Sequence, residues 1–389
     1  MKCYNITNGR RAVLSSGRRH IKPVDGIIRR ALRRGAARIN VTPSDRRTDR
    51  LALEETDETH DRAAAALALA AAVGPAQAQT PIVLKFSHVV APDTPKGKAA
   101  EKFKELGEKY TNGKVKIEVY HNSTLYKDKE ELEAMQLGAV QMLAPSNSKF
   151  GPIGIREFEV FDLPFLIPSL ADLRKVTEGP IGQKMLKLME PKGMIGLAYW
   201  DNGFKQMSAN KPLRKPEDYK GLKFRIQSSK VLEAQFRALG AIPQVMAFSE
   251  VYQALQTGVV DGQENTPSNM YTQKMDEVQK YTTLTNHGYI GYVVVVNKKF
   301  WEGLPGDVRD QLSKAMKEAT AYGNEISAKE NAEALDEMKK KGKTQFITLT
   351  AAEMDAMKKA MAPIYDDMAK RVGKDAIADV QKTIGGATH

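Results

Sequence analysis

The sequence predicts an α/β fold in which helices cover a mostly parallel sheet. Residues 82–144 alternate strand, helix, strand, helix and strand with short connections, which is typical of such a sheet. The chain has 389 residues, of which 42% are apolar, so it is long enough for two to three domains with sizeable cores. Apart from an alanine-rich stretch near the start, no apolar run approaches the ~20 residues that span a bilayer.

Each predicted strand and helix in residues 82–144 is explained by residues within it or next to it. Residues 82–88 alternate as a first strand that ends on His88, and 96–110 carries apolar residues at helical spacing. The Asn112-Gly113 turn precedes a second strand over 114–120. Gly138 ends a helix over 128–137, and 140–144 forms a third strand.

The later elements follow the same rules. Ser169 is the expected cap of a helix that runs to Thr177, and Thr350 with Glu353 forms a capping box. Asp201-Asn202-Gly203 is expected to be a turn. Further predicted strands span 194–200, 221–227, 281–285, 289–297 and 343–348, and further helices end near 189 and span 305–339.

The first 62 residues differ from the rest. Residues 1–60 hold 12 Arg and 2 Lys against 7 acids, whereas residues 63–389 carry a net charge of only +5 out of +12. The basic character therefore lies mostly outside the globular part, which weakens a nucleic-acid interpretation.

The alanine-rich run over 63–73 leads into Ala76-x-Ala78, the small-residue pattern of a signal-peptide cleavage site. We expect residues 63–78 to be the signal region, cleavage after Ala78 and a periplasmic location. Residues 1–62 are then an atypical basic extension or a misplaced start, because acids replace the usual positive charge before the run. Arg46-Arg47 leaves the Sec and twin-arginine routes both open.

Several chemistries lack a signature. The only cysteine is Cys3, and the six histidines show no metal-ligand spacing. No glycine-rich nucleotide loop and no nucleophile elbow is present. We therefore expect neither a cofactor nor a metal, and no catalytic residues.

Arg225 is the first candidate binding residue. It alternates with the apolar Phe224 and Ile226, so its side chain projects from the other face of the strand. A guanidinium held there offers a rigid fork of donors for a carboxylate, and Asn265 adds an amide donor. The alternative is that Arg225 pairs with one of the chain's own acids, such as Glu264 or Asp261.

A second group of candidates follows strand ends, where parallel sheets bind ligands. His88 and Ser146 lie there, together with Asn147. Lys149 is nearby, but we expect it to be a solvated surface residue.

Three segments then resemble the signature segments of DctP-type solute-binding proteins of tripartite ATP-independent periplasmic (TRAP) transporters. They are GLKFRIQ from Gly221, MAFSEVYQALQTGVVDGQENT from Met246, and TNHGYIGY from Thr285. The likeness runs in order from about residue 82 to the C-terminal helices, which makes it more specific than any one motif.

The resemblance implies a two-lobed fold of the periplasmic-binding-protein type, with a long helix spanning both lobes. We expect lobe I at 79–202 and 291–332, and lobe II at 203–290 and 333–389. It also implies delivery of an organic acid, foremost a C4-dicarboxylate, to membrane permease subunits by a monomeric receptor. The implied ligand-binding residues are Arg225, Asn265, Phe248, His88, Lys96, Ser146, Lys205 and His287.

Two hypotheses from different classes follow. In the first, the protein is a receptor that closes its lobes on an organic acid. In the second, it is a periplasmic enzyme that anchors a small carboxylate on Arg225 and uses His88 or His287 as a base. The identity of the acid stays open in both, and turnover of a candidate acid would distinguish them.

Overall fold

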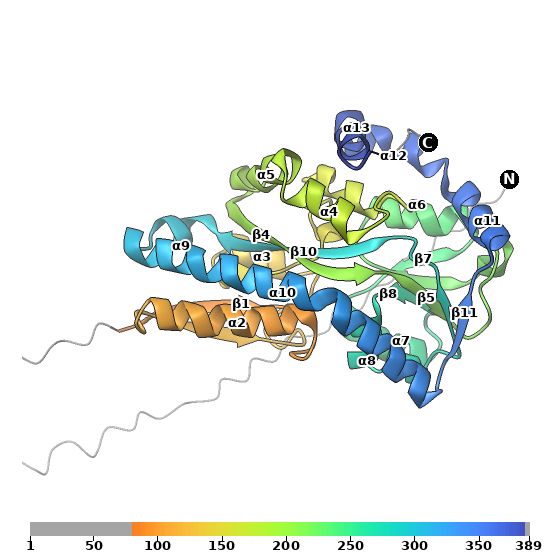
Figure 1. Cartoon of the computed structure of the whole chain (residues 1–389), viewed down its shortest axis with the longest axis horizontal. Helices are drawn as coiled ribbons and strands as arrows, with labels where there is room; N and C mark the ends of the chain where they lie inside the picture. The colour runs from red at the N-terminus through yellow and green to blue at the C-terminus, as the bar shows by residue number, and fades with distance from the viewer. Residues whose placement is uncertain (1–79, 386–389) are drawn as a thin grey trace, which may run out of the picture. The chain divides into compact units, whose positions relative to one another are not determined.

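A computed structural model describes residues 80–385 (Figure 1). The predictions for Cys3, the basic extension, the signal region and the cleavage after Ala78 lie outside the described residues. Within them, two sheets with flanking helices form two lobes, which confirms the predicted α/β class.

The first sheet has the strand order β2-β1-β3-β10-β4. β1 pairs in parallel with β2 and β3, whereas β10 is antiparallel to both β3 and β4. The sheet is therefore mixed, with as many antiparallel as parallel pairings, and not mostly parallel as the sequence predicted. Its strands are β1 (Ile82–Ser87), β2 (Val115–Tyr120), β3 (Met142–Leu143), β4 (Met194–Phe204) and β10 (Tyr289–Asn297).

The second sheet has the order β11-β9-β5-β8-β6-β7 and is also mixed. β5 is antiparallel to β8 and β9, and the other pairs are parallel. Its strands are β5 (Gln206–Ala209), β6 (Lys223–Ile226), β7 (Ile242–Val245), β8 (Gly262–Asn265), β9 (Tyr281–Leu284) and β11 (Gln345–Thr348).

The chain passes between the sheets at β4–β5 and at β9–β10. The turn predicted at Asp201-Asn202-Gly203 is wrong, because these residues continue β4. They remain extended because β10 pairs with them, and a register shift at Ile290/Gly291 absorbs the irregularity of the ladder. A two-strand ladder with buried partners thus overrides the local turn preference.

The long helix α10 (Gly306–Lys341) runs along both lobes (Figure 1). It packs against α2 (Pro95–Tyr110) and β4 in the first lobe, and against α8 (Pro267–Thr272) beside the second sheet. Gly323 permits the close approach to α2, since a Cβ there would lie 2.8 Å from the Cβ of Ala99. The predicted lobe-spanning helix is confirmed.

The remaining helices flank the sheets. Ser169 caps α4 by accepting from Asp172 N at 3.1 Å, and the Thr350–Glu353 capping box opens α11, both as predicted. None of the described helices has the length and apolarity to cross a bilayer. The other helices are α3 (Glu131–Gln136), α4 (Leu170–Thr177), α5 (Pro180–Lys187), α6 (Lys230–Ala238), α7 (Val251–Gln256), α9 (Lys298–Glu302), α11 (Ala351–Met361), α12 (Ile364–Val372) and α13 (Lys374–Thr383).

Candidate ligand-binding site

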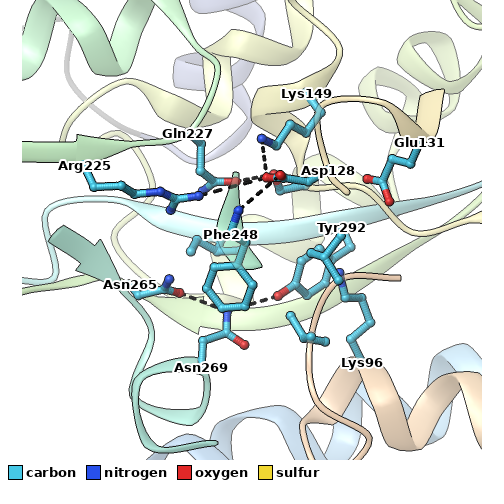
Figure 2. Close-up of a pocket in the computed structure, with 14 residues that line it drawn as sticks. Lys96, Asp128, Glu131, Lys149, Arg225, Gln227, Phe248, Asn265, Asn269 and Tyr292 are labelled. Carbon is cyan, nitrogen blue, oxygen red and sulfur yellow. Dashed lines mark hydrogen bonds and ion pairs between the residues drawn. The ribbon is translucent and has the colours of Figure 1, made fainter. Parts of the chain in front are cut away.

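A cavity lies between the lobes, with polar and charged side chains from both around it (Figure 2). The empty space among its lining atoms measures about 360 Å³, and part of that space is open to solvent. Five of the eight predicted ligand-binding residues line it: Lys96, Ser146, Arg225, Phe248 and Asn265. The other lining residues are Val89, Val90, Asp128, Glu131, Lys149, Gln227, Asn269, Ile290 and Tyr292.

Arg225 projects from β6 into this cavity although it is only 1% exposed. Its Nε and Nη2 both donate to Met246 O, at 3.2 and 2.9 Å, which fixes the plane of the guanidinium. Nη1 donates to no residue of the described range. Neither Glu264 nor Asp261 forms an ion pair with Arg225, but another of the chain's own acids, Asp128, forms a long one. A fixed fork with donors left over is suited to hold a carboxylate.

Asp128 is the acid nearest to Arg225, with its Oδ2 4.0 Å from Nη2. Its stronger partners are Lys149 Nζ at 2.6 Å and the amide of Phe248, which donates to Oδ1 at 3.1 Å. Burial disfavours the charged form, but Lys149 and Arg225 outweigh it and hold the pKa of Asp128 below its usual range. Asp128 therefore has Lys149 as its close partner and Arg225 as a longer one, so it compensates the guanidinium only in part.

The expectation that Lys149 is a solvated surface residue is wrong. Its side chain is 4% exposed and lies in the cavity wall, in a short 3-10 turn after β3. The reason is tertiary: Asp128, which precedes α3, supplies the counter-charge that makes burial of the ammonium tolerable. Because Asp128 and Lys149 are far apart along the chain, the sequence pattern does not indicate this pairing.

Asn265 ends β8 and faces the cavity beside a buried amide network. Its Oδ1 accepts from Thr266 N at 3.0 Å and from Asn269 Nδ2 at 2.9 Å, so its own amide NH₂ points elsewhere and can donate. Asn269 Nδ2 also donates to Tyr292 OH at 3.3 Å, and Asn202 Nδ2 donates to the same oxygen at 2.6 Å. This network joins α8 to β10 and β4.

Lys96 opens α2 and is buried against Tyr292, with Nζ 3.7 Å from the ring centroid. Nζ donates to Ala144 O at 3.0 Å. Ser146 donates to Gln227 Oε1 across the cavity, and the Phe248 ring lies below the guanidinium of Arg225, 5.8 Å from Cζ. Two cations from opposite lobes, Lys96 and Arg225, thus share one cavity.

Lys205 and His287 do not line the cavity; both are fully buried around Glu264. Lys205 Nζ lies 2.5 Å from Glu264 Oε2, and His287 Nε2 lies 2.9 Å from the same oxygen. Lys205 sits between β4 and β5, His287 between β9 and β10. Glu264 therefore links the two places where the chain passes between the sheets, β4–β5 and β9–β10. Lys205 and His287 contact Glu264 and do not line the cavity.

His88 also lies outside the cavity lining. Its Nε2 is 2.8 Å from His121 Nδ1, and His121 Nε2 is 2.8 Å from Glu101 Oε1. Burial, with the nearby Lys96 charge, lowers the pKa of His88 well below its ordinary value, so the ring is neutral.

The sequence did not point to several lining residues, among them Asp128, Glu131, Asn269 and Tyr292. Asp128 and Glu131 belong to an acid-rich segment that is typical of a solvated helix face. Two of these residues could have been found from the quoted signature segments. Tyr292 ends the segment from Thr285, and Asn269 closely follows the segment from Met246. Among residues 80–385, no group of His, Cys, Asp and Glu has the geometry of a metal site.

Comparisons with known proteins agree with this architecture. A sequence model of "Bacterial extracellular solute-binding protein, family 7" (DctP) matches residues 86–371. The C4-dicarboxylate-binding periplasmic protein DctP of Rhodobacter capsulatus is 64% identical over 318 residues, which cover 82% of this chain and 95% of that protein.

Two solved structures are similar throughout their length. A TRAP periplasmic solute-binding protein from Shewanella oneidensis, with bound succinate, has a TM-score of 0.77 and 44% identity, covering 78% of this chain and 100% of that one. One from Pseudomonas aeruginosa, with bound L-malate, has a TM-score of 0.72 and 45% identity, covering 74% and 100%. The chain belongs to the DctP family of bacterial extracellular solute-binding proteins.

Proposed function

We propose that this protein is the periplasmic receptor of a TRAP transporter and captures a C4-dicarboxylate between its two lobes. The observation that carries the proposal is Arg225, a buried guanidinium fixed by Met246 O and facing the cavity with donors left over. The relatives named above, which carry C4-dicarboxylates in their names or bound in their structures, support the ligand class.

In this proposal, one carboxylate of the ligand lies against Arg225 and the Asn265 amide. The second carboxylate lies toward Lys96 in the other lobe. Because the two cations belong to different lobes, the ligand bridges the lobes and favours their closure. A membrane permease then receives the acid from the closed receptor.

The enzyme hypothesis has less support. Its two candidate bases, His88 and His287, lie outside the cavity lining and are engaged by His121 and by Glu264. We propose that the acid leaves the protein unchanged.

Calorimetric titration of the purified protein with succinate, L-malate and butyrate tests the proposal. The two dicarboxylates should bind saturably and butyrate much more weakly, since butyrate lacks the second carboxylate. Recovery of unchanged succinate after incubation supports a receptor, whereas a product peak supports the enzyme. If neither succinate nor L-malate binds, the proposed ligand class is wrong.

A further inference from the structure

Glu131 is a cavity-lining acid whose charge has no obvious partner. It is the first residue of α3 and is 1% exposed. Its Oε2 is buried and accepts no hydrogen bond from the described residues. Figure 2 shows Glu131 on the Asp128 side of the cavity, with no dashed line to its carboxylate. A buried carboxylate left this way is costly if ionised.

Lys96 is the matching unpaired cation. Its ammonium has a carbonyl and an aromatic ring as neighbours, and it forms no ion pair with an acid among residues 80–385. Glu131 and Lys96 nevertheless influence each other's charge across the cavity, and Asp128 and Lys149 influence both. Two other titratable side chains lie near Lys96, and both are neutral: burial lowers the pKa of His88 well below its ordinary value and raises the pKa of Tyr292 to about 12.

The cavity has a simple charge balance. Arg225, Lys149 and Lys96 supply three positive charges, and Asp128 and Glu131 supply two negative ones. The balance is +1 whether the Lys96–Glu131 pair is ionised or the proton has moved to make both neutral. A monocarboxylate therefore neutralises the site, whereas a dicarboxylate leaves one uncompensated negative charge in a buried place.

The Lys96–Glu131 pair can gain or lose a proton near neutral pH. Burial raises the pKa of Glu131 to about 8, with Lys96 opposing it. Burial lowers the pKa of Lys96 to about 7, with Glu131 opposing it. The pair therefore holds about one proton between pH 7 and 8. A bound dianion favours both the ammonium and the carboxylic acid, and so favours a second proton.

We propose that the Lys96–Glu131 pair takes up one proton from solvent as a dicarboxylate dianion binds, and that this proton lets the site hold a dianion without an uncompensated negative charge. After this uptake, Lys96 is an ammonium and Glu131 is a carboxylic acid. Glu131 can then donate a hydrogen bond to the ligand. No covalent bond of the ligand changes. This inference rests on the proposed function and concerns the same cavity.

The test is calorimetry in buffers of different ionisation enthalpy at pH 7.5, where succinate is fully ionised. The slope of apparent enthalpy against buffer enthalpy gives the protons taken up. Succinate should take up close to one proton and a monocarboxylate close to none. Between pH 7 and 8, where the free pair holds about one proton and takes up a second on binding, Kd for succinate should rise by about tenfold per pH unit.

Lys96→Gln/Glu131→Gln removes both titrating groups, so it should bind succinate more weakly, because Lys96 no longer faces the second carboxylate, and without proton uptake. The matched control is Lys102→Gln/Glu105→Gln, an exposed ion pair on α2, which should behave as the wild type. Succinate binding to wild type with no proton uptake and a pH-independent Kd overturns the inference but leaves the proposed function intact. Full uptake by the Lys96/Glu131 double variant also overturns it. Absence of succinate binding to wild type rejects the proposed function instead.

Discussion

Glu264→Gln should strongly destabilise the fold, because Glu264 neutralises Lys205 at the strand crossings. Both side chains are fully buried, and the nitrogen and oxygen lie 2.5 Å apart. Removing one partner of a buried ion pair typically costs about 3–5 kcal/mol, since the other charge stays buried without compensation.

The pKa of Glu264 gives an independent magnitude. Burial would raise this pKa, but the Lys205 charge and the His287 hydrogen bond outweigh burial and lower it from 4.5 to about 2. At about 1.4 kcal/mol per pH unit, the ionised carboxylate contributes roughly 3 kcal/mol. A lowered carboxylate pKa gives stability that is present above pH 4.5 and is lost as the pH falls toward 2.

Urea unfolding of wild type and Glu264→Gln measures this contribution. We expect a loss of about 3 kcal/mol at pH 7 that shrinks at pH values below 4.5. Lys205→Met/Glu264→Gln should recover part of the loss, because no unpaired ammonium remains. Glu105→Gln, in an exposed pair, should cost at most about 1 kcal/mol. A loss below about 1 kcal/mol for Glu264→Gln at pH 7 would refute this reasoning.

Two further predictions concern other contacts. Thr350→Ala removes the side-chain acceptor of the α11 capping box and should lower the free energy of unfolding by about 1 kcal/mol in urea titrations; no change would mean that the cap contributes nothing. Lys149→Met leaves Arg225 as the only ion-pair partner of the buried Asp128 among the described residues, so we expect a loss of about 3 kcal/mol in stability and weaker succinate binding, because Asp128 then competes for the guanidinium. Wild-type stability and affinity in this variant would contradict the role given to Lys149.

The elements that could be predicted are those whose cause is local. The caps at Ser169 and Thr350 depend on residues three positions apart, and the position of Arg225 depends on strand alternation. The turn at 201–203 failed because its extended shape depends on β10, which lies far along the chain.

The site could be predicted only in part, for the same reason. Arg225 and Asn265 lie in motifs that are legible along the chain, whereas the burial of Lys149 depends on Asp128 in another element. Lys205 and His287 were predicted to bind the ligand because they match ligand-lining positions in the family that the sequence resembles. In the structure, both side chains contact Glu264 instead, and no sequence spacing indicates these contacts.

The central claim is that the Arg225 guanidinium grips a carboxylate of the ligand, and succinate titration of Arg225→Lys tests it most directly. The lysine keeps the positive charge but cannot supply two parallel donors. We expect affinity to fall by at least about 30-fold, the equivalent of roughly 2 kcal/mol, in a variant that still unfolds cooperatively. Succinate affinity equal to that of wild type would contradict the claim.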